Sequence, residues 1–189
     1  MPVMLSINLN AQQKQDLLAL AKESVKIGSK DAAAKFILKH TDSIYTEQAA
    51  CFVTLHKNNK LRGCIGSLEA HRSLYLEVSE NAYAAANSDP RFVAVSVSEM
   101  SELSWHISIL GSPVKMKCNS LNELIEKLDK NKDGLIIEEG SHKATFLPSV
   151  WETLPDKGEF VARLQMKAGL PCGYWSEHME ISTYQCQEI

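Results

Sequence analysis

The feature that most constrains the fold is a pair of asparagines between two short runs typical of β-strands. Residues 51–55 are mostly β-branched, aromatic or aliphatic, and residues 61–66 begin with leucine and include isoleucine and two glycines. Asn58 and Asn59 tolerate the positive φ angles that a tight hairpin turn requires. The sequence therefore predicts two antiparallel strands joined at this turn.

Helical patterns alternate irregularly with further strand-like runs. Helices are predicted at about 11–27 (capped by Asn10 and ended by Gly28), 31–39, 73–86, 120–130 and 158–168. Strands are predicted at about 105–110, 135–137 and 144–147, and the tail from Glu180 to Cys186 is expected to pair as an edge strand. Because hairpins replace repeated βαβ units, the pattern favours an α+β fold with an antiparallel-rich sheet and flanking helices.

Composition narrows the classes of function. The chain has 189 residues, 44% of them hydrophobic, which is enough to bury a core for one domain or two small subdomains. Twenty Lys and Arg face 23 Asp and Glu, with no run of like charge, so nucleic acid is not an expected partner. No apolar stretch approaches roughly 18 residues, so neither a membrane span nor a secretory signal is expected.

The cysteines indicate a reducing compartment. There are five, widely spaced and without a Cys-x-x-Cys pair, which predicts neither a disulfide framework nor a zinc site. We therefore expect a cytoplasmic protein with reduced thiols and without a bound metal.

One of these cysteines lies in the glycine-flanked run Leu61-Arg62-Gly63-Cys64-Ile65-Gly66. In a regular strand the side chains of Arg62 and Cys64 share a face, and a nearby positive charge favours the thiolate, the nucleophilic form of cysteine. The glycines let a substrate or another backbone approach closely. In the alternative interpretation the glycines serve a β-bulge, and Cys64 packs as a small apolar residue.

A nucleophilic cysteine also needs a base. The histidines considered are His56, His71, His106 and His142, and none is tied to Cys64 by a diagnostic spacing. Each alone is more commonly a surface or structural histidine. The sequence leaves the choice of base open.

The turn formed by Asp89, Pro90 and Arg91 has two interpretations as well. A rigidly placed guanidinium binds an anionic ligand, or the aspartate caps the turn and pairs with the arginine. There is no Gly-x-Gly-x-x-Gly or P-loop pattern to indicate a nucleotide, so the cofactor is unknown.

Taken together, the motifs resemble those of the AMMECR family, in particular its members from bacterial AmmeMemoRadiSam systems. The hexapeptide 61–66 is identical to the family's hallmark. The other blocks occur in the family's order, over nearly the whole chain: 51–55, 89–92, 107–110, 132–137, 145–151 and 167–171.

The resemblance implies a compact α+β fold in which residues 1–189 form a single domain of two intertwined subdomains around a cleft close to the hexapeptide. It also implies Memo-like and radical SAM proteins as partners. It brings with it no established reaction.

The resemblance further marks a set of site residues. Cys64 is the candidate catalytic residue, and the candidate ligand-binding residues are Arg62, Gly63, Gly66, Asp89, Arg91, Thr145 and Lys167. His106 and His142 depart from the family's pattern, which has an acidic residue and an arginine there. Two hypotheses result: an enzyme that uses Cys64, or a non-catalytic accessory protein that binds a partner or ligand.

Overall fold

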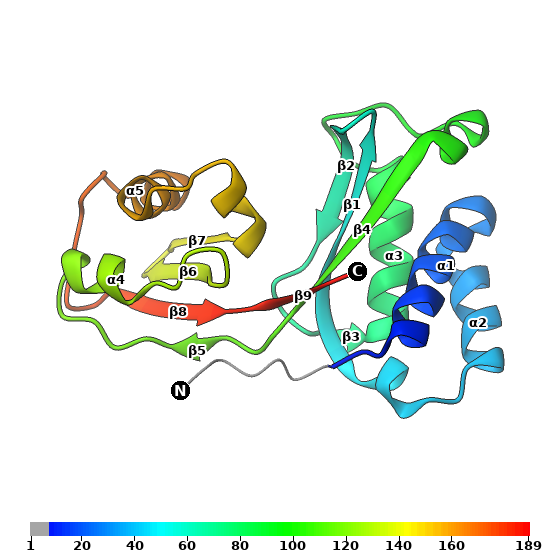
Figure 1. Ribbon diagram of the computed structural model, residues 1–189, viewed down its shortest axis with the longest axis horizontal. Helices are drawn as coiled ribbons and strands as arrows, with labels where there is room; N and C mark the ends of the chain where they lie inside the picture. The colour runs from blue at the N-terminus through cyan, green and yellow to red at the C-terminus, as the bar shows by residue number, and fades with distance from the viewer. Residues whose placement is uncertain (1–7) are drawn as a thin grey trace. The chain divides into compact units, whose positions relative to one another are not determined.

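The computed structural model describes residues 8–189, which form two compact units (Figure 1). The N-terminal unit comprises residues 8–110 together with 187–189, and the C-terminal unit comprises residues 111–186. Across the described residues, no helix has both the length and the apolar character needed to cross a bilayer.

The N-terminal unit is a sheet with helices packed against it. Its sheet has the order β2-β1-β4-β9, with β3 paired to β1. The helices are α1 (Ala11–Ile27), α2 (Ser29–Lys39) and α3 (Leu74–Asn87), and the strands are β1 (Gln48–Lys57), β2 (Lys60–Gly66), β3 (Arg72–Ser73), β4 (Leu103–Leu110) and β9 (Cys186–Glu188). Two 3₁₀ helices, Ser43–Thr46 and Val97–Glu102, complete the unit.

The predicted hairpin and the first helix are confirmed. Strands β1 and β2 pair antiparallel, and Asn58 and Asn59 have φ angles of 51° and 58°. At the start of α1, the Asn10 side chain accepts a hydrogen bond from the Gln13 backbone while the Gln13 side chain returns one to Asn10, which forms a complete capping box.

The faces of β1 are set by the alternation of its side chains. Cys51, Val53 and Leu55 are fully buried in the core formed with the helices. Figure 1 shows α3 against the sheet, with α1 and α2 packed beyond it. Because successive strand side chains point to opposite faces, Thr54 and His56 lie on the face that the helices leave uncovered.

The C-terminal unit contains a second, smaller sheet with the order β5-β8-β6-β7. Its elements are β5 (Val114–Lys115), α4 (Leu121–Lys127), β6 (Gly134–Glu139), β7 (His142–Phe146), a 3₁₀ helix (Pro148–Glu152), α5 (Lys157–Lys167) and β8 (Glu180–Tyr184). The rings of Trp151 and Phe160, both part of its core, stack with their centroids 3.6 Å apart. The unit therefore has its own hydrophobic core.

The α+β class with antiparallel pairing is confirmed, and one prediction about the tail is wrong. Residues 180–186 were expected to form a single edge strand, but β8 lies inside the second sheet between β5 and β6, and β9 pairs with β4 in the first sheet. Strand β8 is therefore hydrogen-bonded along both of its edges, and its Ile181 and Tyr184 side chains are buried.

Candidate functional site

The hexapeptide forms most of β2, the strand at the end of the first sheet. Its pairing with β1 is interrupted by a bulge: Leu55 pairs with Gly63 and His56 pairs with Leu61, so Arg62 has no partner in β1. The expected sharing of one face by Arg62 and Cys64 applies to a regular strand, and the bulge breaks that regularity between them.

Both glycines of the hexapeptide lie where the backbone packs too closely for any side chain. A methyl group on Gly63 would overlap the carbonyl oxygen of Ala85 on α3, and one on Gly66 would overlap the carbonyl oxygen of Cys51 and the ring of Phe52. Neither glycine has a positive φ angle. Close packing of β2 against its neighbours is therefore the physical reason for both residues.

The outer edge of β2 is closed at Cys64 by two side chains. The backbone N–H of Cys64 donates to Oδ2 of Asp89 over 2.9 Å, and a terminal nitrogen of Arg91 donates to the Cys64 carbonyl over 3.2 Å. Arg91 also donates to both oxygens of Asp89, at 2.9 and 2.7 Å. The pair thus takes the place of a neighbouring strand and fixes the backbone of Cys64.

Asp89 is held as a carboxylate. Its side chain is 2% exposed, yet hydrogen bonds from Arg91 lower its pKa well below the ordinary range; burial opposes this, and the N–H groups of Cys64 and Arg91 add to it. The negative charge and its two backbone partners therefore persist at neutral pH.

Arg62 is directed at a different carboxylate, Glu99. Its guanidinium donates two hydrogen bonds to Glu99, at 2.8 and 3.1 Å, and two more to the carbonyls of Val93 and Ala94, at 2.8 and 3.4 Å. The bonds from Arg62 to Glu99 lower the pKa of Glu99 to about 2, against the opposing effect of burial, and Lys57 adds a positive charge 3.4 Å away. Arg62 therefore ties the segment after Arg91 to the hexapeptide.

The thiol of Cys64 lies in a row of side chains that runs across three strands. Thr54 on β1 pairs with Cys64 on one side and with His106 on β4 on the other. The sulfur of Cys64 and the hydroxyl oxygen of Thr54 are 3.1 Å apart, and His106 is exposed. A thiol, a hydroxyl and an imidazole thus occupy consecutive positions on the face that the helices leave uncovered.

A second histidine adjoins this row. The rings of His56 and His106 meet edge to face, with centroids 5.3 Å apart. Nδ1 of His56 is buried and has no hydrogen-bond partner among the described residues. Burial lowers the pKa of His56, and electrostatic interaction with His106 lowers it further, so the neutral form of His56 is favoured.

The remaining predicted residues lie elsewhere. His71 is exposed and pairs with Glu69 at 3.4 Å. Thr145, Lys167 and His142 belong to the C-terminal unit, where Lys167 donates to the Thr145 carbonyl over 3.0 Å and His142 contacts the Ala168 carbonyl at 2.9 Å. The structure therefore gathers Arg62, Gly63, Cys64, Gly66, Asp89 and Arg91 in one unit and places Thr145 and Lys167 together in the other.

Two residues of this region were not identified from the sequence. Thr54 was treated only as part of a strand, although its place between buried Val53 and Leu55 indicates the opposite face. Glu99 carries no local signal, because its partner Arg62 is 37 residues away. Among residues 8–189, no three His, Cys, Asp or Glu side chains are arranged to hold a metal ion.

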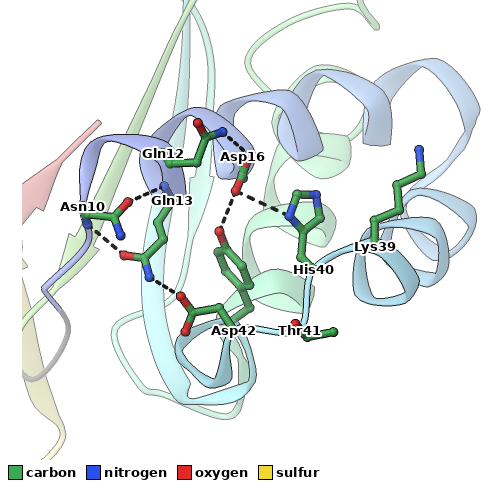
Figure 2. A pocket seen from close by; sticks show the side chains of 9 residues that line it. Asn10, Gln12, Gln13, Asp16, Lys39, His40, Thr41 and Asp42 are labelled. Carbon is green, nitrogen blue, oxygen red and sulfur yellow. Dashed lines mark hydrogen bonds and ion pairs between the residues drawn. The ribbon is translucent and has the colours of Figure 1, made fainter.

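A polar hollow of about 250 Å³ lies at another place in the N-terminal unit (Figure 2). It is bordered by the start of α1, the end of α2 and the 3₁₀ helix Ser43–Thr46. Asp16 accepts hydrogen bonds there from Gln12 at 2.9 Å and from Tyr45 at 2.8 Å, and His40 lies 3.4 Å away. Its lining includes no residue of the hexapeptide.

Comparison with known proteins assigns the family. Residues 18–189 match the family model described as AMMECR1. Protein MJ0810 of Methanocaldococcus jannaschii is 37% identical over 164 residues, which cover 82% of this chain and 80% of that protein. Protein MK0488 of Methanopyrus kandleri is 32% identical over 184 residues, with coverage of 95% and 88%.

A solved structure agrees. The crystal structure of the uncharacterized protein PH0010 from Pyrococcus horikoshii superposes with a TM-score of 0.79 at 30% sequence identity, and the match covers 91% of this chain and 88% of that one. With a family model matched over more than nine-tenths of its residues, the chain belongs to the AMMECR1 family.

Proposed function

We propose that Cys64 is the reactive group of this protein and acts as a thiol nucleophile in an enzyme-associated role. The observation that carries the proposal is the placement of its sulfur on the uncovered face of the sheet, 3.1 Å from the Thr54 hydroxyl, on a backbone held by Asp89 and Arg91. A fixed backbone reduces the entropy lost when the sulfur reaches a reacting atom.

The chemistry follows from the thiol. The sulfur attacks an electrophilic carbon, an S–C bond forms, the leaving group departs with its electron pair, and the thiol proton passes to a base. Arg91 is the candidate to hold an anionic group of the substrate, because its side chain is 54% exposed while that of Arg62 is 13% exposed. Lys167 and Thr145 remain proposed ligand-binding residues.

Alkylation with iodoacetamide, followed residue by residue with mass spectrometry, tests the nucleophile. Exposed Cys172 serves as the reference thiol in the same chain, and buried Cys51, whose pKa burial raises to about 12, is expected to stay unmodified. We expect Cys64 to react at least as fast as Cys172 at pH 7. A Cys64 thiol that resists labelling in the folded protein would remove the nucleophile.

A second candidate function is that of an accessory protein that binds a partner without catalysis. It is favoured by the hydrogen bonds that occupy Arg62 and Asp89, and by two exposed apolar side chains on the segment that Arg62 holds: Val93 is 82% exposed and Val97 is 88% exposed. The family resemblance of the hexapeptide supports Memo-like and radical SAM proteins as the partners.

Co-purification with each of these two partners decides between the candidates. An accessory role predicts that Val93→Asp and Val97→Asp abolish association while Cys64→Ala leaves it intact. If Cys64 is the nucleophile, Val93→Asp and Val97→Asp should leave its modification by iodoacetamide intact. Failure of the wild-type chain to associate with either partner would count against the accessory role.

A cytoplasmic location is part of the proposal, because a reactive thiol persists in a reducing compartment. Cell fractionation with an antibody against the chain tests it.

A further inference from the structure

We infer that Thr54 and His106 form the path by which the Cys64 thiol loses its proton, with His56 as the residue that positions His106. The inference rests on the proposed function and deepens it by naming the base, which the sequence left open among four histidines. It concerns the row defined by the pairing of Thr54 with Cys64 and with His106.

The two groups that take part in the first step, the Cys64 thiol and the Thr54 hydroxyl, are in contact. The thiol sulfur and the Thr54 hydroxyl oxygen are 3.1 Å apart, and a hydroxyl accepts one hydrogen bond while donating another. The Thr54 hydroxyl is therefore able to receive a proton from sulfur and pass its own proton onward.

The second step is set by the register of β1 and β4. Thr54 and His106 are directly opposite each other, and such cross-strand partners have Cβ atoms about 5 Å apart. His106 is exposed on the same face as the hydroxyl, and its ring packs edge to face against that of His56. His71 and His142 lie outside this row, on a loop and in the C-terminal unit.

His56 supplies an independent observation. Its buried Nδ1 has no hydrogen-bond partner among residues 8–189, and an unsatisfied buried polar atom costs free energy that a functional role explains. Its ring meets that of His106 edge to face. A neutral ring at this position restricts His106 without adding a second positive charge beside it, and such a charge would disfavour proton uptake.

The other titratable and charged groups of this face are few. Cys64 lies on β2, His56 on β1 and Glu188 on β9, where Glu188 accepts a hydrogen bond from Ser108 of β4 over 2.7 Å. At the outer edge of β2, Asp89 and Arg91 form an ion pair with each other.

The labelling reaction itself reports the path. When iodoacetamide alkylates Cys64, an S–C bond forms and iodide leaves with its electron pair; the thiol proton goes to the oxygen of Thr54, whose own proton goes to a ring nitrogen of His106. The rate of labelling at Cys64 between pH 5 and pH 9 therefore depends on whether His106 is free to accept a proton.

The experiment compares five proteins. In the wild type, we expect the Cys64 rate to rise through the range in which imidazole loses its proton. Thr54→Val and His106→Gln should slow Cys64 at pH 7 by about tenfold and remove that rise. Thr54→Ser keeps a hydroxyl and should restore the wild-type profile, and His71→Gln, which changes an exposed histidine outside the row, should leave it unchanged.

The labelling rate at Cys172 shows whether a change at Cys64 is specific to that site. In every variant the rate at Cys172 must stay constant, and circular dichroism must show the native fold. If Thr54→Val and His106→Gln label Cys64 at the wild-type rate with the wild-type pH profile, the proton path is wrong and the nucleophile stands. If Cys64 is not labelled in the wild type, both the path and the proposed function are wrong.

Discussion

The N-terminal unit contains two polar regions that differ in how water competes for their hydrogen bonds. At the hexapeptide, the nearly buried Asp89 accepts from the Cys64 backbone and Arg62 pairs with Glu99, beside the point where Gly63 packs against α3 too closely for a methyl group. At the polar hollow, the hydrogen bonds to Asp16 border an open space of about 250 Å³ (Figure 2).

Similar contacts in the two regions are expected to contribute unequally to the free energy of unfolding. Glu99 and Asp16 both have side chains that are 15% exposed, and both have lowered pKa values. Arg62 holds Glu99 with two charged hydrogen bonds, whereas Asp16 is held by neutral donors that water in the hollow is able to replace. We therefore expect the hexapeptide to be sensitive to substitution and the hollow to be tolerant.

The largest effect should come from Gly63→Ala. The added methyl group would overlap the Ala85 carbonyl, and we expect a loss of about 3 kcal/mol in the free energy of unfolding, measured with urea. Gly140→Ala is the matched control: Gly140 has a φ of 58° but open space around its Cα, so only backbone strain of about 1 kcal/mol should appear. Equal losses in the two variants would contradict the packing explanation.

The next effect should come from Arg62→Met. We expect a loss of about 2–3 kcal/mol at pH 7, because Glu99 and the carbonyls of Val93 and Ala94 lose their shared donor. Arg163→Met, which breaks only an exposed pair with Glu159, should cost less than about 0.5 kcal/mol.

The same variant has a signature in acid. Because folding lowers the pKa of Glu99 from 4.5 to about 2, the stability that Glu99 contributes is present above pH 4.5 and is lost as the pH falls toward 2. Arg62→Met should therefore lose less stability than the wild type between pH 4.5 and pH 2 in urea unfolding. Parallel acid profiles for the two proteins would show that this ion pair does not set the pKa of Glu99.

A smaller effect is expected from Asp16→Asn at the hollow. Burial raises the pKa of Asp16, but hydrogen bonds from Gln12 and Tyr45 and the charge of His40 outweigh it, so the carboxylate stabilises the fold at neutral pH and loses that effect in acid. An asparagine keeps an oxygen acceptor, so the loss at pH 7 should be about 1 kcal/mol. A loss as large as that of Arg62→Met would remove the distinction between the two regions.

The smallest effect should come from Gln12→Ala. This exposed side chain donates to Asp16 one turn further along α1, and such pairs contribute less than about 0.5 kcal/mol. Thermal unfolding should place this variant close to the wild type. A larger loss would mean that the hollow excludes water.

Local signals in the sequence predicted the elements but not how distant elements meet. Asn58 and Asn59 predicted the hairpin, since the turn depends on their own φ angles. The bulge at Arg62 was only one of two interpretations, because a bulge depends on how β2 packs against β1 and α3. The edge position expected for residues 180–186 was wrong because strand order depends on which apolar faces meet.

Some residues of the candidate site were likewise predicted from the sequence, and others were not. The glycine-flanked cysteine and the Asp89 and Arg91 turn were identified from the sequence, and their partners were not. Thr54 lies ten residues from Cys64 in the chain, and Glu99 lies 37 residues from Arg62. No local pattern encodes such pairs, because they form only after the strands are in register.

Features that depend on neighbouring residues could be predicted from the sequence: the capped first helix, the hairpin turn and the resemblance of the hexapeptide to a family hallmark. Three features depend on the folded arrangement of distant segments: Asp89 closes the strand edge at Cys64, Arg62 faces Glu99, and Thr54 lies between the thiol and His106. Local features are predictable because backbone propensities act over a few residues. Hydrogen bonds between distant side chains are not, because they require the packing that brings distant segments together.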